Sequence, residues 1–430
     1  MVIKFPIRNV FPFCPRIEAI RIPNYSNRNS NSYRDVWHPM GFSDCCRNVG
    51  CDADAHYDFG FASKNHYRTY IWCRQIEIMS SMQKGKYMKA VIFPGGSQVQ
   101  FVDLPTPTAD HGDVVIKVKA SSICRSDMGL YTGESNIVGG EKAGTGVVVP
   151  GHEPAGVIVE VGTGVEVRRV GDRVAVHLAL GCGQCGFCNQ GFTYLCAEWK
   201  CIGFDVNGGN AEYIQVPERN ALPLPDSLSF VAGALMTDMV GTQYHVQNKL
   251  EVRGGKNVLV VGLGPMGSAA VLVAKAFGAR VIGVDVLPER LEFAMGLGAD
   301  EVINSDDKAL GKIMQLTDGR GADVVVECSG NSLGQNLGLN AAAKLGAFTF
   351  VGESRETTLN PSDQIIRKML TVVGGWYFPI SDWPKIVDLV LTKKINVERL
   401  VTHTFSLDQA ALAFDQFYNY KTEKAVFILE

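Results

Sequence analysis

Short apolar runs separated by glycine and proline dominate the chain between Met88 and Leu224. Examples are MKAVIFPGG, VQFVDLPTP, GDVVIKVKASSIC and EPAGVIVEVG. β-Branched residues in such short runs favour partly buried strands, and the breaks at glycine and proline favour turns between them. This part of the chain is therefore predicted to be a β-rich domain.

A different pattern begins near residue 256, where apolar strands alternate with helical stretches. KNVLVVGLGPMGSAAVLVAKAFGARVIGVD predicts a buried strand, a glycine turn, a helix and a second strand that ends at Asp285. The alternation continues through ADEVINS, ADVVVECSG, LGAFTFVG and LTVVGG. Such alternation predicts an α/β fold with a parallel, doubly wound sheet. After it, WPKIVDLVLTKK predicts a helix and KAVFILE a last strand.

Residues 1–87 show no clear period. They hold twelve Lys and Arg against seven Asp and Glu, a net charge of +5, whereas the remainder of the chain carries -8. Prolines would interrupt an amphipathic targeting helix. We predict a disordered N-terminal extension that is dispensable for chemistry, with Met88 as the true start; an organelle presequence is the alternative. Two histidines and three cysteines there match no metal-binding spacing: His38, Cys45, Cys46, Cys51 and His56.

The bulk composition narrows the classes of function. With 430 residues, 46% of them hydrophobic, the chain is long enough for two or three domains with cores of their own. A net charge of -3 gives no overall attraction to nucleic acid or to an anionic membrane, so a small molecule is the expected partner. The most apolar stretch, residues 258–274, is interrupted by three glycines and a proline and is predicted as strand, turn and helix rather than a membrane span.

Four cysteines follow one another as C-x-x-C-x-x-C-x7-C: Cys182, Cys185, Cys188 and Cys196. Four glycines interrupt the same loop: Gly181, Gly183, Gly186 and Gly191. The glycines permit tight turns that bring thiolates at this spacing round one metal, and four sulfurs leave no position for substrate. The pattern predicts a structural zinc site. An iron–sulfur cluster or a rubredoxin-like iron would use the same thiolates, and disulfides would be the alternative in a secreted protein. Because metal sites account for most cysteines after Met88, a reducing, cytoplasmic location is expected.

A G-x-G-x-x-G turn joins the first strand and helix of the α/β region. It holds Gly262, Gly264 and Gly267, together with Pro265 and Met266. The first glycine allows a tight turn, the second lets backbone approach a pyrophosphate, and the third lets helix and strand pack closely. Asp285 ends the next strand about twenty residues further on, where a carboxylate accepts hydrogen bonds from both ribose hydroxyls. Since this charge repels a 2′-phosphate, NAD is predicted; Arg290 keeps the NADP alternative open, and glycines needed only for packing are the other alternative.

Further residue types that bind zinc lie on either side of the four cysteines. Cys124 lies in SSICRSD, His152 and Glu153 lie in PGHEPAG, and Asp238 lies in ALMTDMVG. Each is ordinary alone, because a single cysteine or histidine is usually part of a core and an aspartate can cap a helix. The set as a whole carries the functional interpretation.

The order of these elements over residues 88–430 resembles that of the zinc-dependent medium-chain alcohol dehydrogenases. It runs from a C-x-[ST]-D element through a G-H-E element, the four-cysteine lobe and a further ligand to G-x-G-x-x-G. The resemblance implies that Cys124, His152 and Asp238 bind a catalytic zinc, with Glu153 beside the metal or as an exchangeable fourth ligand. The carboxylate of Asp238 is typical of the branch that includes secondary-alcohol and polyol dehydrogenases.

The resemblance also implies the domain organisation. It predicts a GroES-like β-rich catalytic domain (88–238 and 374–430) with the structural zinc lobe at 181–197, and a Rossmann domain (239–373) that binds NAD. Two zinc ions and one NAD per chain, an alcohol or polyol substrate and a homodimer or homotetramer follow from it.

Individual roles come from the same resemblance. Ser126 matches the hydroxyl that contacts the substrate oxygen and begins a proton relay, Asp127 matches a residue that orients the histidine ligand, and Arg125 matches a contact to the cofactor pyrophosphate. Gly129 departs from relatives that have a histidine there, so the later path of the proton is expected to run through water. The substrate pocket is expected along residues 177–180 and near Tyr131 and Trp376.

Two other functions compete with this interpretation. A zinc-independent quinone or enone reductase of the same fold would lack the zinc ligands, all of which are present here. A catalytically inactive nucleotide-binding relative would keep the fold without turnover, and the sequence alone leaves that alternative open.

Overall fold

The computed structural model describes residues 87–134 and 148–430. The predictions for the N-terminal extension, including its histidines and cysteines, lie outside the described residues. Within the described ranges, no helix combines the length and apolar character needed to cross a membrane.

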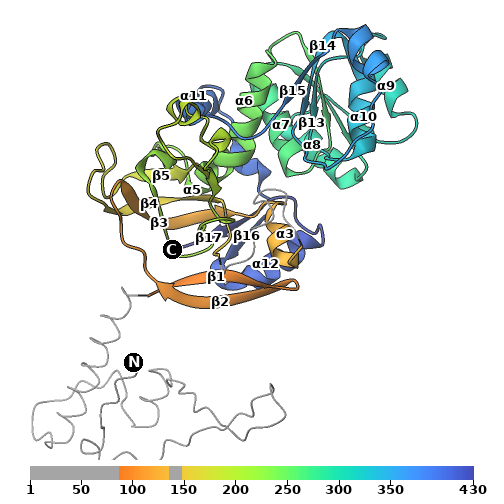
Figure 1. The fold of residues 1–430 in the computed structure, drawn as a ribbon. Coiled ribbons are helices and arrows are strands. Elements are labelled where there is room, and N and C mark those ends of the chain that lie inside the picture. Colours follow the sequence, from red (N-terminus) through yellow and green to blue (C-terminus); the bar gives the residue numbers. More distant parts are fainter. Residues whose placement is uncertain (1–86, 135–147) are drawn as a thin grey trace, which may run out of the picture. The chain divides into compact units, whose positions relative to one another are not determined.

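The β-rich region is built on two sheets and a hairpin (Figure 1). Its strands are β1 (Tyr87–Gly95), β2 (Gln98–Pro105), β3 (Asp113–Ser122), β4 (Glu153–Val161), β5 (Arg173–Val176), β6 (Ala179–Leu180), β7 (Lys200–Cys201), β8 (Tyr213–Pro217), β9 (Ala221–Pro223), β16 (His403–Ser406) and β17 (Ala425–Ile428). The larger sheet has the order β16-β17-β3-β4-β5-β9, and β8 also pairs with β3. The β-rich region also contains the helices α3 (Asp127–Thr132), α4 (Gly186–Asn189), α5 (Phe230–Leu235), α11 (Trp383–Thr392) and α12 (Ala410–Tyr418).

Strand β3 is the centre of the larger sheet. It pairs antiparallel with β4 along one edge, and with β8 and then β17 along the other. Most of its side chains are buried, as the apolar run VVIKV predicts. Cys124 lies two residues after the end of this strand, and Glu153 is the first residue of β4, so the pairing of the two strands brings two candidate ligands to one end of the sheet.

The α/β region forms a six-stranded, wholly parallel sheet. Its elements are α6 (Gly241–Lys249), β10 (Asn257–Val261), α7 (Pro265–Ala276), β11 (Arg280–Asp285), α8 (Pro288–Leu297), β12 (Glu301–Asn304), α9 (Ala309–Leu316), β13 (Ala322–Glu327), α10 (Ser332–Ala341), β14 (Ala342–Phe350) and β15 (Thr371–Gly374). The strand order is β12-β11-β10-β13-β14-β15. Strands β11 and β12 follow on one side of β10, and β13, β14 and β15 follow on the other, so the sheet is doubly wound. The predicted fold class is confirmed.

The continuous apolar run of β10 is explained by burial on both faces. Val258 and Val260 belong to one hydrophobic core, which includes α7, whereas Leu259 and Val261 belong to a second core on the opposite face. Side chains alternate across a strand, and helices cover both faces of a parallel sheet. The strand therefore needs no polar positions.

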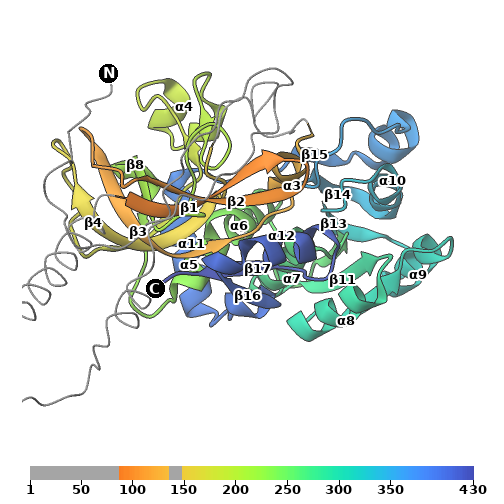
Figure 2. The same cartoon turned by 90° about the horizontal axis from the view of Figure 1, so that it is seen from below.

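After the parallel sheet the chain returns to the first sheet. Strand β17 pairs antiparallel with residues 120–122 of β3, and Figure 2 shows this blue C-terminal segment beside the orange early strands. The return places the segment after α12 close to residues that are far away in the sequence. Its consequences for the site are described below.

Candidate active site

Asp238 lies on an irregular turn of helix. Residues Met236–Val240 form a π-helical turn between α5 and α6, and the Asp238 side chain within it is buried. π-Turns are rare and frequently occur at functional sites. The wider turn joins α5 to α6 and contains the residue with the carboxylate.

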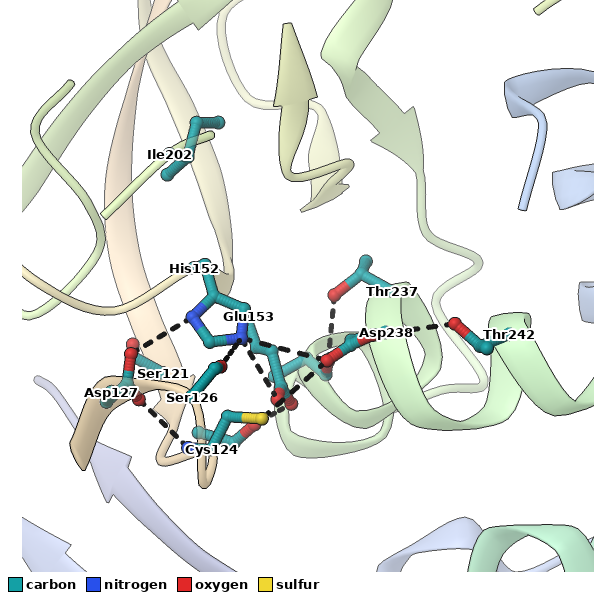
Figure 3. Close-up of polar contacts among 12 residues, drawn as sticks. Ser121, Cys124, Ser126, Asp127, His152, Glu153, Ile202, Thr237, Asp238 and Thr242 are labelled. Carbon is teal, nitrogen blue, oxygen red and sulfur yellow. Dashed lines mark hydrogen bonds and ion pairs between the residues drawn. The ribbon is translucent and has the colours of Figure 1, made fainter. Parts of the chain in front are cut away.

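Four side chains converge at the end of the β3–β4 pair (Figure 3). Cys124, His152, Glu153 and Asp238 each offer one donor atom, and all four atoms lie within 4.8 Å of one another. The Asp238 Oδ2 atom is 3.8 Å from the Cys124 Sγ atom and 3.7 Å from the His152 Nε2 atom. Sulfur, nitrogen and carboxylate oxygen at such separations fit a single zinc ion.

Asp127 fixes two members of this cluster. Its Oδ1 atom lies 3.1 Å from His152 Nδ1, and its Oδ2 atom accepts a hydrogen bond of 2.9 Å from the backbone N–H of Cys124 (Figure 3). The first contact leaves Nε2 of His152 pointing at the cluster, as a metal-binding histidine requires. Ser126 is also at the site, with its Oγ atom 3.5 Å from His152 Nε2.

Glu153 has a partner that the sequence did not reveal. Lys424 Nζ donates a hydrogen bond of 2.7 Å to Glu153 Oε1, and both side chains are buried. The Ser122 hydroxyl donates to the other carboxylate oxygen. No sequence motif indicates this pair, because 271 residues separate its members and only the return of β17 brings them together.

The charges at the site favour a bound cation. Asp127, Glu153 and Asp238 are buried carboxylates beside a cysteine thiol, and Lys424 is the permanent cation among the described residues in direct contact with them. Burial lowers the pKa of His152, but the neighbouring Asp127 carboxylate outweighs this and raises that pKa well above its ordinary value. The cluster therefore attracts positive charge, which a divalent metal would supply.

The four lobe cysteines also converge. Their sulfur atoms lie within 4.8 Å of one another, and none of the four forms a disulfide. Backbone N–H groups of Cys182 and Glu198 each approach Cys196 Sγ at 3.4 Å. Hydrogen bonds from the backbone of Gln184 and Cys185 lower the pKa of Cys182 to about 7, whereas burial raises the pKa of Cys188 to about 12. Such N–H contacts stabilise thiolate, the form that binds metal.

Three of the four loop glycines are required by the geometry. Gly183 and Gly191 have φ angles of +82° and +88°, and a Cβ atom on Gly181 would lie 2.5 Å from Cys188 Sγ. Gly186 differs from this expectation, because its surroundings are open and its φ is not positive. It is the first residue of α4, where other residues would fit.

The glycine turn and its predicted partners line one cleft of about 790 Å³. Of the residues predicted to bind cofactor, the lining includes Arg125, Gly262, Gly264, Pro265, Met266, Asp285 and Arg290. Cys124 lies in the same lining, so the cleft reaches the four-donor cluster. Gly267 does not line the cleft, because it packs against the backbone of Gly262. A Cβ atom at Gly267 would lie only 1.8 Å from the carbonyl oxygen of Gly262. Its role is to let α7 approach β10.

Asp285 is fixed at the end of β11. Its Oδ2 atom accepts a 2.7 Å hydrogen bond from the backbone N–H of Leu263, and its Oδ1 atom accepts one of 3.0 Å from Leu287. The carboxylate is thereby held against the glycine turn, where an adenosine ribose would lie.

The expected substrate wall differs in part from the structure. His177 is fully buried, with its ring bonded to the backbone of Phe378 and Ala179, and Tyr131 packs into a separate core beside Phe414. Both side chains are buried by these contacts. Trp376 belongs instead to an aromatic cluster with Tyr377, Tyr194, Trp199 and Phe204, and Phe204 lies 5.2 Å from the His152 ring. Tyr377 in this cluster has a φ of +51°, which is unusual for a tyrosine.

A dinucleotide-type cleft that ends at a buried cluster of thiol, imidazole and carboxylates defines a metal-dependent oxidoreductase. The family described as "Alcohol dehydrogenase GroES-like domain" matches residues 110–226, and the family described as "Zinc-binding dehydrogenase" matches residues 265–392. The chain belongs to the zinc-type alcohol dehydrogenase family, and the family predicted from the sequence is confirmed.

The chain aligns with nearly the whole length of individual relatives. An uncharacterized zinc-type alcohol dehydrogenase-like protein of Escherichia coli K12 is 37% identical over 79% of this chain and 98% of its own length. A sorbitol dehydrogenase of Bacillus subtilis is 32% identical over 78% and 95%, respectively. A crystal structure of an Escherichia coli CFT073 alcohol dehydrogenase with NADH matches with a TM-score of 0.72 and 29% identity, covering 80% of this chain and 100% of that one.

Proposed function

We propose that the chain oxidises a secondary alcohol or a polyol to the carbonyl compound, with zinc and NAD+ as cofactors. The observation that carries this proposal is the convergence of Cys124, His152, Glu153 and Asp238 in the same cleft as the glycine turn and Asp285. A metal at those donors would lie at the inner end of a bound dinucleotide, where a hydride can pass between two substrates.

Each side chain of the cluster has a distinct task. Cys124, His152 and Asp238 would hold the zinc, while Glu153 is either a fourth donor or is held aside by Lys424. Zinc supplies a Lewis acid that makes the hydroxyl proton of an alcohol easier to remove, and NAD+ supplies the hydride acceptor. Asp127 orients the imidazole of His152 through Nδ1.

We propose that the Ser126 hydroxyl is the first group to accept the proton that leaves the alcohol. Its hydroxyl lies 3.5 Å from His152 Nε2, beside the donor atoms where the substrate oxygen would bind. A hydroxyl can accept one proton while it donates its own, so it relays without holding charge. Gly129 offers no side chain, so the next carrier is proposed to be water.

The test of this function is a panel of secondary alcohols and polyols with NAD+, followed by NADH absorbance. We expect turnover with at least one member and none after the zinc has been removed. A zinc-independent quinone or enone reductase would instead reduce quinones or enones, and it would do so without zinc. An inactive relative would bind NADH but would turn over neither the alcohols nor the quinones and enones.

The lobe cysteines give a separate prediction about metal content. Cys196→Ser should lower bound zinc from about two to about one per chain, because it removes one of four ligands from a closed structural site and leaves the other cluster intact. Elemental analysis measures this loss, and circular dichroism reports whether the parallel sheet persists. Two zinc ions retained in the variant would contradict a structural zinc in the lobe.

We propose the division into residues 88–238 with 374–430 and 239–373, a homodimer or homotetramer, and a cytoplasmic enzyme without nucleic-acid or membrane partners. Light scattering of the full chain distinguishes the two assemblies from a monomer.

A further inference from the structure

Two arginines that line the dinucleotide cleft are both held by the segment that follows α12. The Arg125 guanidinium lies 4.2 Å above the ring of Tyr420 and bonds to its hydroxyl. Arg290 Nε donates a hydrogen bond of 2.8 Å to Glu423 Oε1. All four side chains line the same cleft. Residues of the return segment therefore take part in the cofactor site, although no sequence motif indicates them.

Arg290 is the arginine at the predicted ribose position. Besides Glu423, its Nη1 atom lies 3.9 Å from Asp285 Oδ2. A Cβ atom on Gly264, the second glycine of the turn, would lie 3.7 Å from the Arg290 guanidinium. The cation is thus placed between the glycine turn and two carboxylates, and all three charged side chains are largely buried, with exposures of 17%, 5% and 16% for Arg290, Asp285 and Glu423.

Glu423 is an unusual partner at this position. Its second carboxylate oxygen, Oε2, is buried and has no hydrogen-bond partner among residues 87–134 and 148–430. Burial raises the pKa of Glu423, which the Arg290 charge opposes. A buried carboxylate oxygen that accepts no hydrogen bond destabilises the folded protein. Local stability alone therefore does not explain a glutamate at position 423.

We infer that Glu423 is a second determinant of the choice of NAD over NADP, acting by holding Arg290. The inference rests on the proposed dinucleotide site. Asp285 repels a 2′-phosphate, and Glu423 holds the one guanidinium that could offset this repulsion. Arg290 is the cation of this trio, and planar guanidinium groups bind phosphate in a bidentate manner. While Glu423 accepts from Nε, the edge of Arg290 that includes Nε is not available to that phosphate, and the guanidinium is held toward the carboxylates.

Direct binding of the reduced cofactors to the full-length protein tests the inference. NADH and NADPH fluorescence, without any alcohol, gives the ratio of their two dissociation constants. Glu423→Ala should shift this ratio toward NADPH by about tenfold, the size of one charge-assisted hydrogen bond. Glu423→Gln, which removes the charge and keeps an acceptor, should shift it in the same direction by less, and it remains informative if the alanine variant does not fold.

Two further variants separate this mechanism from a general charge effect. Glu289→Gln removes an exposed carboxylate that neighbours Glu423 and has no ion pair to Arg290, so it should change the ratio by less than about twofold. In an Arg290→Gln background, Glu423→Ala should leave the ratio unchanged. The inference is overturned if Glu423 variants leave the ratio unaltered, if Glu289→Gln matches them, or if their effect persists without Arg290.

The outcome is independent of catalysis. If the protein binds NADH but oxidises no alcohol, the proposed function fails while the cofactor ratio still reports on Glu423. If it oxidises alcohols and the ratio is insensitive to Glu423, only the inference fails.

Discussion

Replacing Cys124 by alanine should lower kcat by at least about a thousandfold, equivalent to about 4 kcal/mol of lost transition-state stabilisation. The variant loses the thiol of the four-donor cluster, and the three remaining donors are two carboxylates and one imidazole. NADH should still bind, because the glycine turn and Asp285 are unchanged. Steady-state NADH production measures the first effect and cofactor fluorescence the second.

Cys201→Ala is the matched control for this experiment. Cys201 is also a buried thiol, its pKa raised to about 12 by burial, but it belongs to the aromatic cluster and to neither group of metal donors. Its replacement should leave zinc content at the catalytic cluster intact. Full activity in the Cys124 variant would refute the metal-dependent mechanism, and equal losses in both variants would point to packing instead.

Replacing Lys424 by methionine should lower the free energy of unfolding by about 3–5 kcal/mol. The lysine is 1% exposed and Glu153 is fully buried, so the variant leaves a carboxylate without its compensating cation. Chemical denaturation of metal-free protein, followed by tryptophan fluorescence, measures the loss without a contribution from zinc binding.

The double variant Lys424→Met with Glu153→Gln separates charge from packing. Because the glutamine is neutral and can still accept the hydrogen bond of Ser122, stability should recover by more than half of the loss. No recovery would show that the lysine stem, rather than its charge, stabilises this region. A loss below about 1 kcal/mol in the single variant would indicate that Glu153 is protonated when unpaired.

Local patterns predicted most of the fold and the grouping of the four lobe cysteines. The apolar run of β10, the glycine turn and Asp285 are close in sequence, so their geometry follows from a strand, a turn and a helix. The four lobe cysteines are similarly local. The convergence of Cys124, His152 and Asp238 was inferred from the family resemblance, because no local rule brings β3, β4 and the π-helical turn to one point.

The missed residues share a physical cause. Lys424 and Glu423 lie on the segment that returns from the parallel sheet to β3, so their contacts depend on tertiary pairing rather than on sequence spacing. The substrate pocket was expected along residues 177–180 and near Tyr131, and packing buries the side chains of His177 and Tyr131. Residue type predicts what a side chain can do, whereas its exposure depends on neighbours that only the folded chain supplies.

The return of β17 also sets an order of events during synthesis on the ribosome. Cys124 and Glu153 emerge early, but Lys424 is translated 271 residues after Glu153, when the whole parallel sheet has already been made. Until then Glu153 has no cation beside it, and β3 lacks one of its neighbours. The buried Glu153–Lys424 pair therefore forms only after the last strand has docked.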